Sequence, residues 1–388
     1  MLDPRLGPML IQEGVIRLAE GLETGLLGLL HRAGLAPDVD GQPGWPFAVR
    51  FASETLLIDL GLARKLSLFL SMVLLALLLL AACAIWRRAR LPLFAAALVL
   101  FLAAPWPDFS LLVAQAYPTS FHRSPARFDA ASIRSGVALY QKNCADCHGQ
   151  DGQGEGPRAP DPPMWPPRIS AELLARRIEG EVFWHIRAGM HDRHGIATMP
   201  GFADQLDPAQ VWSILDALRA LAAGASVREE AAWAAPVRAP EVEVRCPGLG
   251  IQPLSRLRGQ RVRIVASPSM IALPREDPRL VTIALVPAHE APSGGATCVI
   301  EGEEAYDAYA LLAGTDPQRF AGTQLIIDRA GWLRARAAPG SKGWSRDDLL
   351  CRSANARLSA GPRPDGLGDL IAAMDADPVR VGRLGATH

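Results

Sequence analysis

The sequence carries no net charge, because 40 aspartate and glutamate residues balance its 40 lysine and arginine residues. A strongly basic chain would indicate nucleic acid as a partner, and a strongly acidic chain a cationic surface, so the balance favours neither. The first 60 residues also lack a recognisable targeting signal. The first long apolar run begins beyond residue 60, which is too deep for an ordinary N-terminal signal.

The chain also lacks the ligand set of a structural zinc site. Cys144 and Cys147 are separated by two residues, but no second Cys or His pair at similar spacing follows them. A thioredoxin-like redox pair would need a strand before it and a long helix after it. Here a helix-like stretch precedes the cysteines and a glycine-rich loop follows them. What remains is two cysteines followed directly by His148, which is the attachment signature of a c-type haem.

The spacing of these three residues suits that chemistry. Two thiols one helical turn apart can each add to a haem vinyl group, and the residue after the second thiol then lies under the iron. The sequence therefore predicts one haem c, attached covalently through Cys144 and Cys147. The imidazole of His148 is the predicted proximal ligand of the iron.

Residues 128–224 around the signature resemble the class I cytochrome c family. In that family the first helix carries a small residue and, one turn later, an aromatic residue where it crosses the last helix. Gly136 and Tyr140 match this spacing. The last helix matches a stretch with Asp207 as its N-cap, which carries apolar residues at helical spacing: Val211, Ile214, Leu215, Leu218 and Leu221. The resemblance implies an all-α domain.

The same resemblance implies three further roles at the haem. Pro157, which follows Gly156, matches the proline whose carbonyl accepts the Nδ1–H of the proximal histidine and so orients the ring. Met199, which precedes a proline, matches the sixth ligand of the iron. Trp212 matches the aromatic residue that packs near the haem edge.

Three other side chains, close to Met199 in the sequence, could compete for the sixth coordination position of the iron. Met190 is expected at the end of a helix over residues 181–187, closed by Gly189, and His191 and His194 follow it. A haem with two histidine ligands would have a lower potential than one with histidine and methionine. These three residues could also hold copper, because thioether and imidazole suit that ion. We prefer a solvated, histidine-rich loop.

Two charge-free runs predict a transmembrane hairpin over residues 61–116. Leu66 to Trp86 contains no charged residue, and a span needs about 20 apolar residues. The second run, residues 91–107, is near the short limit. The basic turn over residues 87–90 lies between them and marks the cytoplasmic side. Both flanks are then outside the bacterial inner membrane, where the family resemblance implies that haem is attached.

The segment after the second run has two interpretations. Residues 114–116 look like a signal-peptidase site, and cleavage after Ala116 would release a soluble haem protein. We prefer a juxtamembrane linker. Residues 116–121 resemble the junction in fusions between copper-resistance D membrane proteins and a C-terminal cytochrome c. Those proteins have many more spans, so the resemblance implies a membrane-bound cytochrome and says little about copper transport.

The N-terminal segment, residues 1–60, predicts an amphipathic helix on the outer side of the membrane. Its apolar residues recur every three or four positions: Ile11, Val15, Leu18, Leu22, Leu26 and Leu29. We expect this helix to lie on the membrane surface or to cover a helix of a partner. The remaining segments are a cytochrome c domain over 117–224, a linker over 225–240 rich in Ala, Glu and Pro, and a third domain over 241–388.

The third domain resembles a thioredoxin-like α/β fold. The elements that carry the resemblance are strands at 261–266 and 280–286, a helix at 304–313, a hairpin of strands 324–328 and 332–336, and helices at 346–356 and 366–374. The active features of that family are missing. Ser267 to Met270 stand where its Cys-x-x-Cys would be, and Gly322 or Thr323 replaces its cis-proline, so disulfide exchange by the usual route is excluded. A binding or structural role remains.

The third domain contains three cysteines. In an oxidising compartment two of them can form a disulfide, and the pattern does not decide which. Cys298 with Cys351 is our expectation, and Cys246 is then left over.

The predicted function is a membrane-anchored periplasmic c-type cytochrome that transfers single electrons. An iron with both axial positions filled exchanges electrons and does not bind substrate. By resemblance its redox partners are a bc1-type complex, a dehydrogenase or a terminal oxidase. Two alternatives stay open: a copper-handling or oxidase-assembly factor with a client-binding thioredoxin-like domain, and the haem subunit of a dehydrogenase complex.

Overall fold

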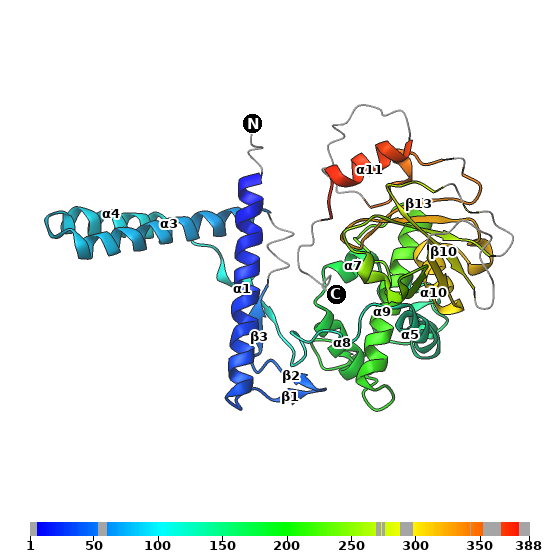
Figure 1. Cartoon of the computed structure of the whole chain (residues 1–388). Helices are drawn as coiled ribbons and strands as arrows, with labels where there is room; N and C mark the ends of the chain where they lie inside the picture. Colours follow the sequence, from blue (N-terminus) through cyan, green and yellow to red (C-terminus); the bar gives the residue numbers. More distant parts are fainter. Residues whose placement is uncertain are drawn as a thin grey trace. The chain divides into compact units, whose positions relative to one another are not determined.

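The structure is a computed structural model that describes residues 6–52, 60–268, 273, 276–287, 298–341, 343–351 and 366–379. The chain divides into two compact units, one up to His122 and one from Arg123 onward. Figure 1 shows the helices and strands of both units. Each unit is considered by itself.

The first unit is built on a long N-terminal helix, as the spacing of its leucines predicts. Its main elements are α1 (Leu6–Arg32), β1 (Asp38–Val39), β2 (Gln42–Pro43), β3 (Val49–Phe51), α3 (Leu60–Ile85), η1 (Arg87–Ala89), α4 (Arg90–Ala103), η2 (Phe109–Leu112) and β4 (Val113–Gln115). Strands β3 and β4 pair in antiparallel orientation. Ala116 follows β4 directly, is buried and donates its N–H to the carbonyl of Ala48 at 2.9 Å. This favours the linker interpretation of residues 114–116 over a signal-peptidase site.

Only α3 has the length and apolar composition of a membrane span among the helices that the structure describes. Helix α4 runs beside it (Figure 1) but has 14 residues. At 1.5 Å per residue it reaches about 21 Å, which falls short of a hydrocarbon core about 30 Å thick. The predicted hairpin is present as two packed helices, α3 and α4. Of the two, only α3 is long enough to cross a membrane.

The second unit begins with the helices of the cytochrome domain. These elements are α5 (Ala130–Asn143), α6 (Ala145–His148), α7 (Ala171–Ala175), α8 (Glu179–Ala188), β5 (Met190–His191), β6 (Ala197–Met199) and α9 (Pro208–Glu230). The predicted N-cap of the last helix is confirmed. Asp207 Oδ1 accepts the N–H of Gln210 at 2.8 Å, and Gln210 Oε1 accepts the N–H of Asp207 at 3.0 Å. This capping box satisfies N–H groups that would otherwise lack partners at the start of α9.

Helices α5 and α9 cross at Gly136, as the resemblance implies. A Cβ atom at this position would lie 1.9 Å from the carbonyl oxygen of Ser213 and 2.9 Å from the Cβ of Ala217. The helix backbones therefore meet at a distance that no side chain allows. Tyr140, one turn later on α5, is fully buried.

The predicted linker over 225–240 is wrong in its first part. Helix α9 continues through Glu230, and Val227 and Trp233 are buried in a core shared with the C-terminal sheet. Trp233 Nε1 donates to the carbonyl of Leu312 at 2.9 Å. The alanine-rich composition that suggests a linker instead supplies small side chains for close packing between helices.

The C-terminal part is a seven-stranded mixed sheet in the order β13-β12-β9-β10-β11-β7-β8. Its elements are β7 (Glu243–Cys246), β8 (Gly250–Pro253), η3 (Leu254–Leu257), β9 (Val262–Ala266), β10 (Val281–Val286), β11 (Cys298–Glu301), α10 (Glu303–Leu312), η4 (Pro317–Arg319), β12 (Gln324–Ile327), β13 (Leu333–Ala337), η5 (Arg346–Asp348) and α11 (Gly366–Ala376). Strands β9, β10 and β11 are parallel, and the other pairs are antiparallel.

Most elements predicted for this domain are confirmed, including both central strands and the β12–β13 hairpin. The strands β7, β8 and β11 were not predicted. The helix predicted over 346–356 begins as the single 3₁₀ turn η5, and its residues beyond Cys351 lie outside the described part. Of the segment 267–270 only Ser267 and Pro268 are described, so the loop that replaces the Cys-x-x-Cys is not traced as a whole.

Helix α10 joins the sheet to the cytochrome helices. It packs against α5 and α9 on one side and against strands β10 and β11 on the other. Gly224 of α9 permits the closest approach, because a Cβ there would lie 2.1 Å from the carbonyl oxygen of Leu311. One apolar cluster includes Ile133 and Ala220 from the cytochrome helices together with Ile264 of the sheet. The helices α5 and α9 and the sheet therefore share a core.

The predicted disulfide pair is wrong. The bond joins Cys246 to Cys298, whose Cα atoms are 4.3 Å apart, and Cys351 is a buried free thiol. The reason is the pairing of β7 with β11, which places Arg245 opposite Val299 and so brings the neighbouring cysteines together. Polar and apolar residues alternate over 241–246, which is typical of a strand. The pattern does not say with which strand β7 pairs, so the partner of Cys298 could not be read from it.

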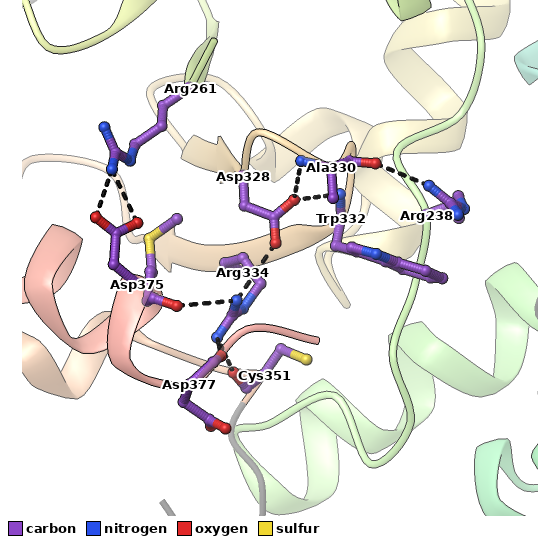
Figure 2. A network of polar contacts seen from close by, with 10 residues as sticks. Arg238, Arg261, Asp328, Ala330, Trp332, Arg334, Cys351, Asp375 and Asp377 are labelled. Carbon is purple, nitrogen blue, oxygen red and sulfur yellow. Dashed lines mark hydrogen bonds and ion pairs between the residues drawn. The ribbon is translucent and has the colours of Figure 1, made fainter. Parts of the chain in front are cut away.

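A buried arginine ties α11 to the edge of the sheet (Figure 2). The side chain of Arg334, on β13, is 1% exposed and lies 3.3 Å from the Asp328 carboxylate. Its guanidinium also donates to the carbonyls of Cys351 at 3.3 Å and Asp377 at 2.6 Å. The carboxylate of Asp328 in turn accepts the N–H groups of the hairpin turn. One charge pair thus holds the hairpin and the C-terminal helix together.

Replacing Gly136 by alanine is predicted to separate α5 from α9. Because the added methyl group would overlap a backbone carbonyl, we expect the free energy of unfolding to fall by about 3 kcal/mol. Denaturant unfolding followed by circular dichroism measures the loss. Ser135→Ala, at the exposed neighbouring position, is the control. Equal stability of the two variants would contradict the observed crossing.

Replacing Arg334 by methionine is predicted to leave the Asp328 carboxylate buried without its cation. The expected loss in the free energy of unfolding is about 3–5 kcal/mol. Arg245→Met is the control, because its ion pair with Glu301 is largely exposed and such pairs contribute about 0–1 kcal/mol. If denaturant unfolding showed a similar loss of free energy in both variants, the buried network would contribute no more than an exposed ion pair.

Candidate functional site

The two cysteines of the haem signature lie at the junction of α5 and α6. Helix α5 begins at the N-cap Asp129, whose Oδ1 accepts the N–H of Ser132 at 2.7 Å, and it ends at Asn143. Cys144 stands at the break, and α6 then carries Cys147 and His148. The phenol of Tyr140 donates to the carbonyl of Gly149 at 2.6 Å and so ties the end of α6 back to α5.

Cys144 is a poor nucleophile for disulfide exchange. Burial, with a smaller contribution from Cys147, raises the pKa of the Cys144 thiol to about 12. A thiol that stays protonated at neutral pH reacts slowly with a disulfide. This disfavours a thioredoxin-like redox role for the pair.

The proximal histidine is held in an apolar setting. Burial lowers the pKa of the His148 imidazole, and the backbone carbonyl of Pro167 acts in the opposite direction. The Nδ1 atom is buried and makes no hydrogen bond within the part of the chain that the structure describes. Burial favours the neutral imidazole, and the neutral imidazole is the form that binds a metal. His148 therefore fits the role of an iron ligand.

The backbone carbonyl of Pro167 acts on the imidazole of His148, whereas the resemblance implies Pro157 for this role, which stays a prediction. Gly156 packs against the backbone of α6, where a Cβ atom would lie 2.3 Å from the carbonyl oxygen of Asp146. Its N–H donates to the carbonyl of Cys147 at 3.2 Å. The Gly-Pro pair therefore anchors the loop to α6, and the Pro166-Pro167 pair further along the chain supplies the neighbouring carbonyl.

One apolar cluster forms the wall beside the signature. Trp212 of α9 is 3% exposed and stacks on Phe183 of α8, with ring centroids 4.7 Å apart. Cys144 and Met199 are partly buried and pack against this same cluster. Three residues predicted from the sequence thus meet at one place. The sequence gives no signal for the role of Phe183, because its partner Trp212 lies on another helix.

Met199 lies on a small hairpin that the sequence does not predict. Strand β6 pairs with β5, and Met199 lies directly opposite Met190. Helix α8 ends at Ala188 and Gly189 closes it, so the prediction that Met190 ends the helix is wrong by a short distance. Directly opposed residues of an antiparallel pair share one face of the hairpin. The two thioethers are therefore neighbours, and Met190 is the more accessible, with 41% of its surface exposed.

Met190, His191 and His194, the copper ligands considered above, lie on the β5–β6 hairpin and its turn. The register of the hairpin shifts between Met190 and His191, and all three residues are exposed. His194 Nε2 accepts from Nε of Arg193 at 3.0 Å. The described residues contain no group of three or more His, Cys, Asp or Glu side chains that could hold a metal ion. The copper site and the solvated loop both stay predictions.

A polar network fixes the helices that frame the site. Asp216 of α9 is almost fully buried, and its Oδ2 accepts the hydroxyl of Ser132 on α5 at 2.7 Å. Arg219, one turn further on α9, forms an ion pair with Glu179 of α8. These contacts connect α5, α8 and α9 from the side away from the apolar cluster. Rigid positioning of haem ligands needs such support.

Comparison with known proteins supports this assignment for part of the chain. Residues 131–216 match the family described as cytochrome C oxidase, cbb3-type, subunit III. The match covers the helices α5 to α9 and supports a cytochrome c domain, which implies covalently bound haem c. No curated protein matches the chain.

A structural likeness exists to a chain of the Kuenenia stuttgartiensis reducing HAO-like protein complex. It covers 33% of this chain and 60% of the other, with 21% sequence identity and a TM-score of 0.23. The present chain thus spans less than two thirds of that relative. A likeness at this TM-score carries no argument about fold or function.

The pairing of Met190 with Met199 makes the identity of the sixth ligand testable. We expect Met199→Ala to lose the thioether-to-iron charge-transfer band of the oxidised protein, and Met190→Leu to keep it, because Met199 is the more buried and packs against Trp212's cluster. Absorbance of the purified protein checks both. Retention of the band in Met199→Ala, with its loss in the double variant, would transfer the role to Met190.

Proposed function

We propose that the chain is a membrane-anchored c-type cytochrome that passes single electrons between redox proteins. The observation that carries the proposal is the meeting of Cys144, Met199 and Trp212 at one apolar cluster, with His148 on the short helix that follows Cys144. The cytochrome c domain over residues 131–216 supports it. The finer assignment of individual ligands is part of the proposal.

In this proposal each side chain has a distinct task. Cys144 and Cys147 would hold the haem by thioether bonds, and His148 and Met199 would ligate its iron. Haem c, when bound, supplies a centre that accepts and releases one electron at a time. With both residues serving as ligands, substrate binding at the iron would not be part of the proposed chemistry.

The protein sets the properties of that centre through its surroundings. The carbonyl of Pro167 orients the imidazole of His148 and increases its basicity. The stacked rings of Phe183 and Trp212 keep water from one side of the site. A thioether ligand and a dry pocket both favour the reduced state and raise the potential. The site therefore suits a carrier of relatively high potential.

The first unit is proposed to anchor the chain in the membrane. We propose that α3 spans the inner membrane, with α4 returning beside it and the basic turn of Arg87, Arg88 and Arg90 on the cytoplasmic side. The cytochrome domain would then lie in the periplasm. A tether raises the concentration of the haem near membrane complexes, so a bc1-type complex, a dehydrogenase or a terminal oxidase is a suitable partner.

The C-terminal sheet is proposed to be a thioredoxin-like domain without redox thiols. The order β10-β9-β12-β13, with β9 and β10 parallel and the hairpin antiparallel, supports this proposal. Its core is continuous with that of the cytochrome. We propose that it acts as a binding or structural part of the same body.

Covalent attachment tests the proposal directly. The full chain, produced in a host that attaches haem c, is predicted to stay coloured after denaturation and to titrate with one electron. The double variant Cys144→Ser, Cys147→Ser should lose the colour, while Cys83→Ser, a thiol of α3, should keep it. A colourless parent protein, or a coloured double variant, would refute the haem assignment.

The anchoring is tested on the same preparations. We predict that the parent chain stays in the membrane pellet after an alkaline carbonate wash. A chain that begins at residue 123 and is exported behind a cleavable secretion signal lacks the first unit and should appear in the soluble fraction with its haem. Release of the full chain by the wash would exclude α3 as a span and leave the haem assignment intact.

A further inference from the structure

The turn of the β12–β13 hairpin borders a small open cavity on the C-terminal domain. Its volume is about 40 Å³. A buried water needs about 10–15 Å³ by this measure, so the space admits a few waters or one small polar group and is too small for a nucleotide or a haem. Its lining includes apolar side chains such as Leu254 and Ile327, and six polar residues: Arg238, Glu241, Ser255, Arg258, Gln260 and Asp328.

Two arginines of this lining converge on one point. A Cβ atom built on Gly331 would lie 3.7 Å from Nη1 of Arg238 and 3.7 Å from Nε of Arg258. Two guanidinium groups of like charge are therefore close together over the same glycine. Such an arrangement is unfavourable unless an anion lies between or beside them.

Arg238 is held in place by its surroundings (Figure 2). Its Nη1 donates to the carbonyl of Ala330 at 2.8 Å, and its guanidinium lies 3.9 Å from the ring centroid of Trp332. Its Nε is buried and makes no hydrogen bond to any residue that the structure describes. A donor is thus available on a side chain whose position is already fixed.

The carboxylates that line the cavity are already engaged. Glu241 accepts the N–H of Ser255 at 2.9 Å and pairs with Arg127 at 3.3 Å. Asp328 accepts two N–H groups of the hairpin turn and pairs with Arg334. Burial, and after it the neighbouring Arg258, lower the pKa of the Arg238 guanidinium. Asp328 acts in the opposite direction and offsets this only in part.

Arg258 is exposed. Within the described residues its guanidinium takes part in no hydrogen bond or ion pair. The Arg238 guanidinium is held in place and the Arg258 guanidinium is exposed, so the two can contact one planar or tetrahedral oxyanion from two sides. Arginine suits this role because its N–H groups match the geometry of such anions.

We propose that this cavity binds a small free oxyanion, such as phosphate or a short carboxylate, between Arg238 and Arg258. The hydroxyl of Ser255 and the amide of Gln260 line the same cavity and are available as further donors. The proposal does not depend on the haem site.

Calorimetric titration of the full-length protein with inorganic phosphate, and separately with acetate, tests the proposal. Sodium chloride at matched ionic strength is the blank. We expect saturable binding of phosphate or acetate to the parent protein, and binding at least tenfold weaker to Arg258→Gln. That variant should fold, because the residue it replaces is exposed and unbonded among the described residues.

Arg256→Gln is the matched control. Arg256 is exposed on η3, two residues away, and does not line the cavity, so its loss removes the same charge and should leave the affinity unchanged. Equal weakening in both variants would show a general charge effect and overturn the proposal. Absence of saturable binding to the parent protein, or equal heats with chloride, would overturn it as well.

Discussion

Helix α9 belongs to two cores at once, and the rest of the second unit depends on this. Its first half carries Val211 and Trp212 into the cluster beside the haem signature. Its second half carries Ala223 and Val227 into the core of the C-terminal sheet. Close approach is possible only because Gly136 faces the first half and Gly224 lies in the second. A change in the packing of α9 therefore affects both the cluster beside the haem signature and the core of the C-terminal sheet.

This arrangement gives the cytochrome a support that a minimal domain lacks. The ligand-bearing segments are short: α6 has four residues and the β5–β6 hairpin has strands of two and three. Such elements have little stability of their own and depend on the longer helices against which they pack. By burying α5, α9 and α10 together, the sheet holds these longer helices in place, and the geometry of the site follows from them.

Three features of the fold could be predicted from residues that lie close together in the sequence. The Cys-x-x-Cys-His pattern, the N-cap at Asp207 and the turn between β12 and β13 each depend on residues close together in the chain, and the structure has a helix, a cap and a hairpin at these places. The crossing at Gly136 was implied by the resemblance to class I cytochromes c and not by the spacing alone.

The errors share a cause, which is that each depends on residues far apart in the chain. Cys246 meets Cys298 because β7 pairs with β11 across 52 residues. Gly224 suggests the end of a helix, yet here it admits the carbonyl of Leu311 and α9 continues. Tertiary packing overrides local preference at each of these positions.

Hydrogen exchange along α9 tests the shared core most directly. If one helix serves both cores, the amides of residues 211–218 and 220–227 must open together, with one common free energy and the same dependence on denaturant. Exchange measured on the haem-loaded full chain by mass spectrometry of overlapping peptides resolves the two halves. A second half that opens independently, while the half beside Trp212 stays protected, would contradict the account.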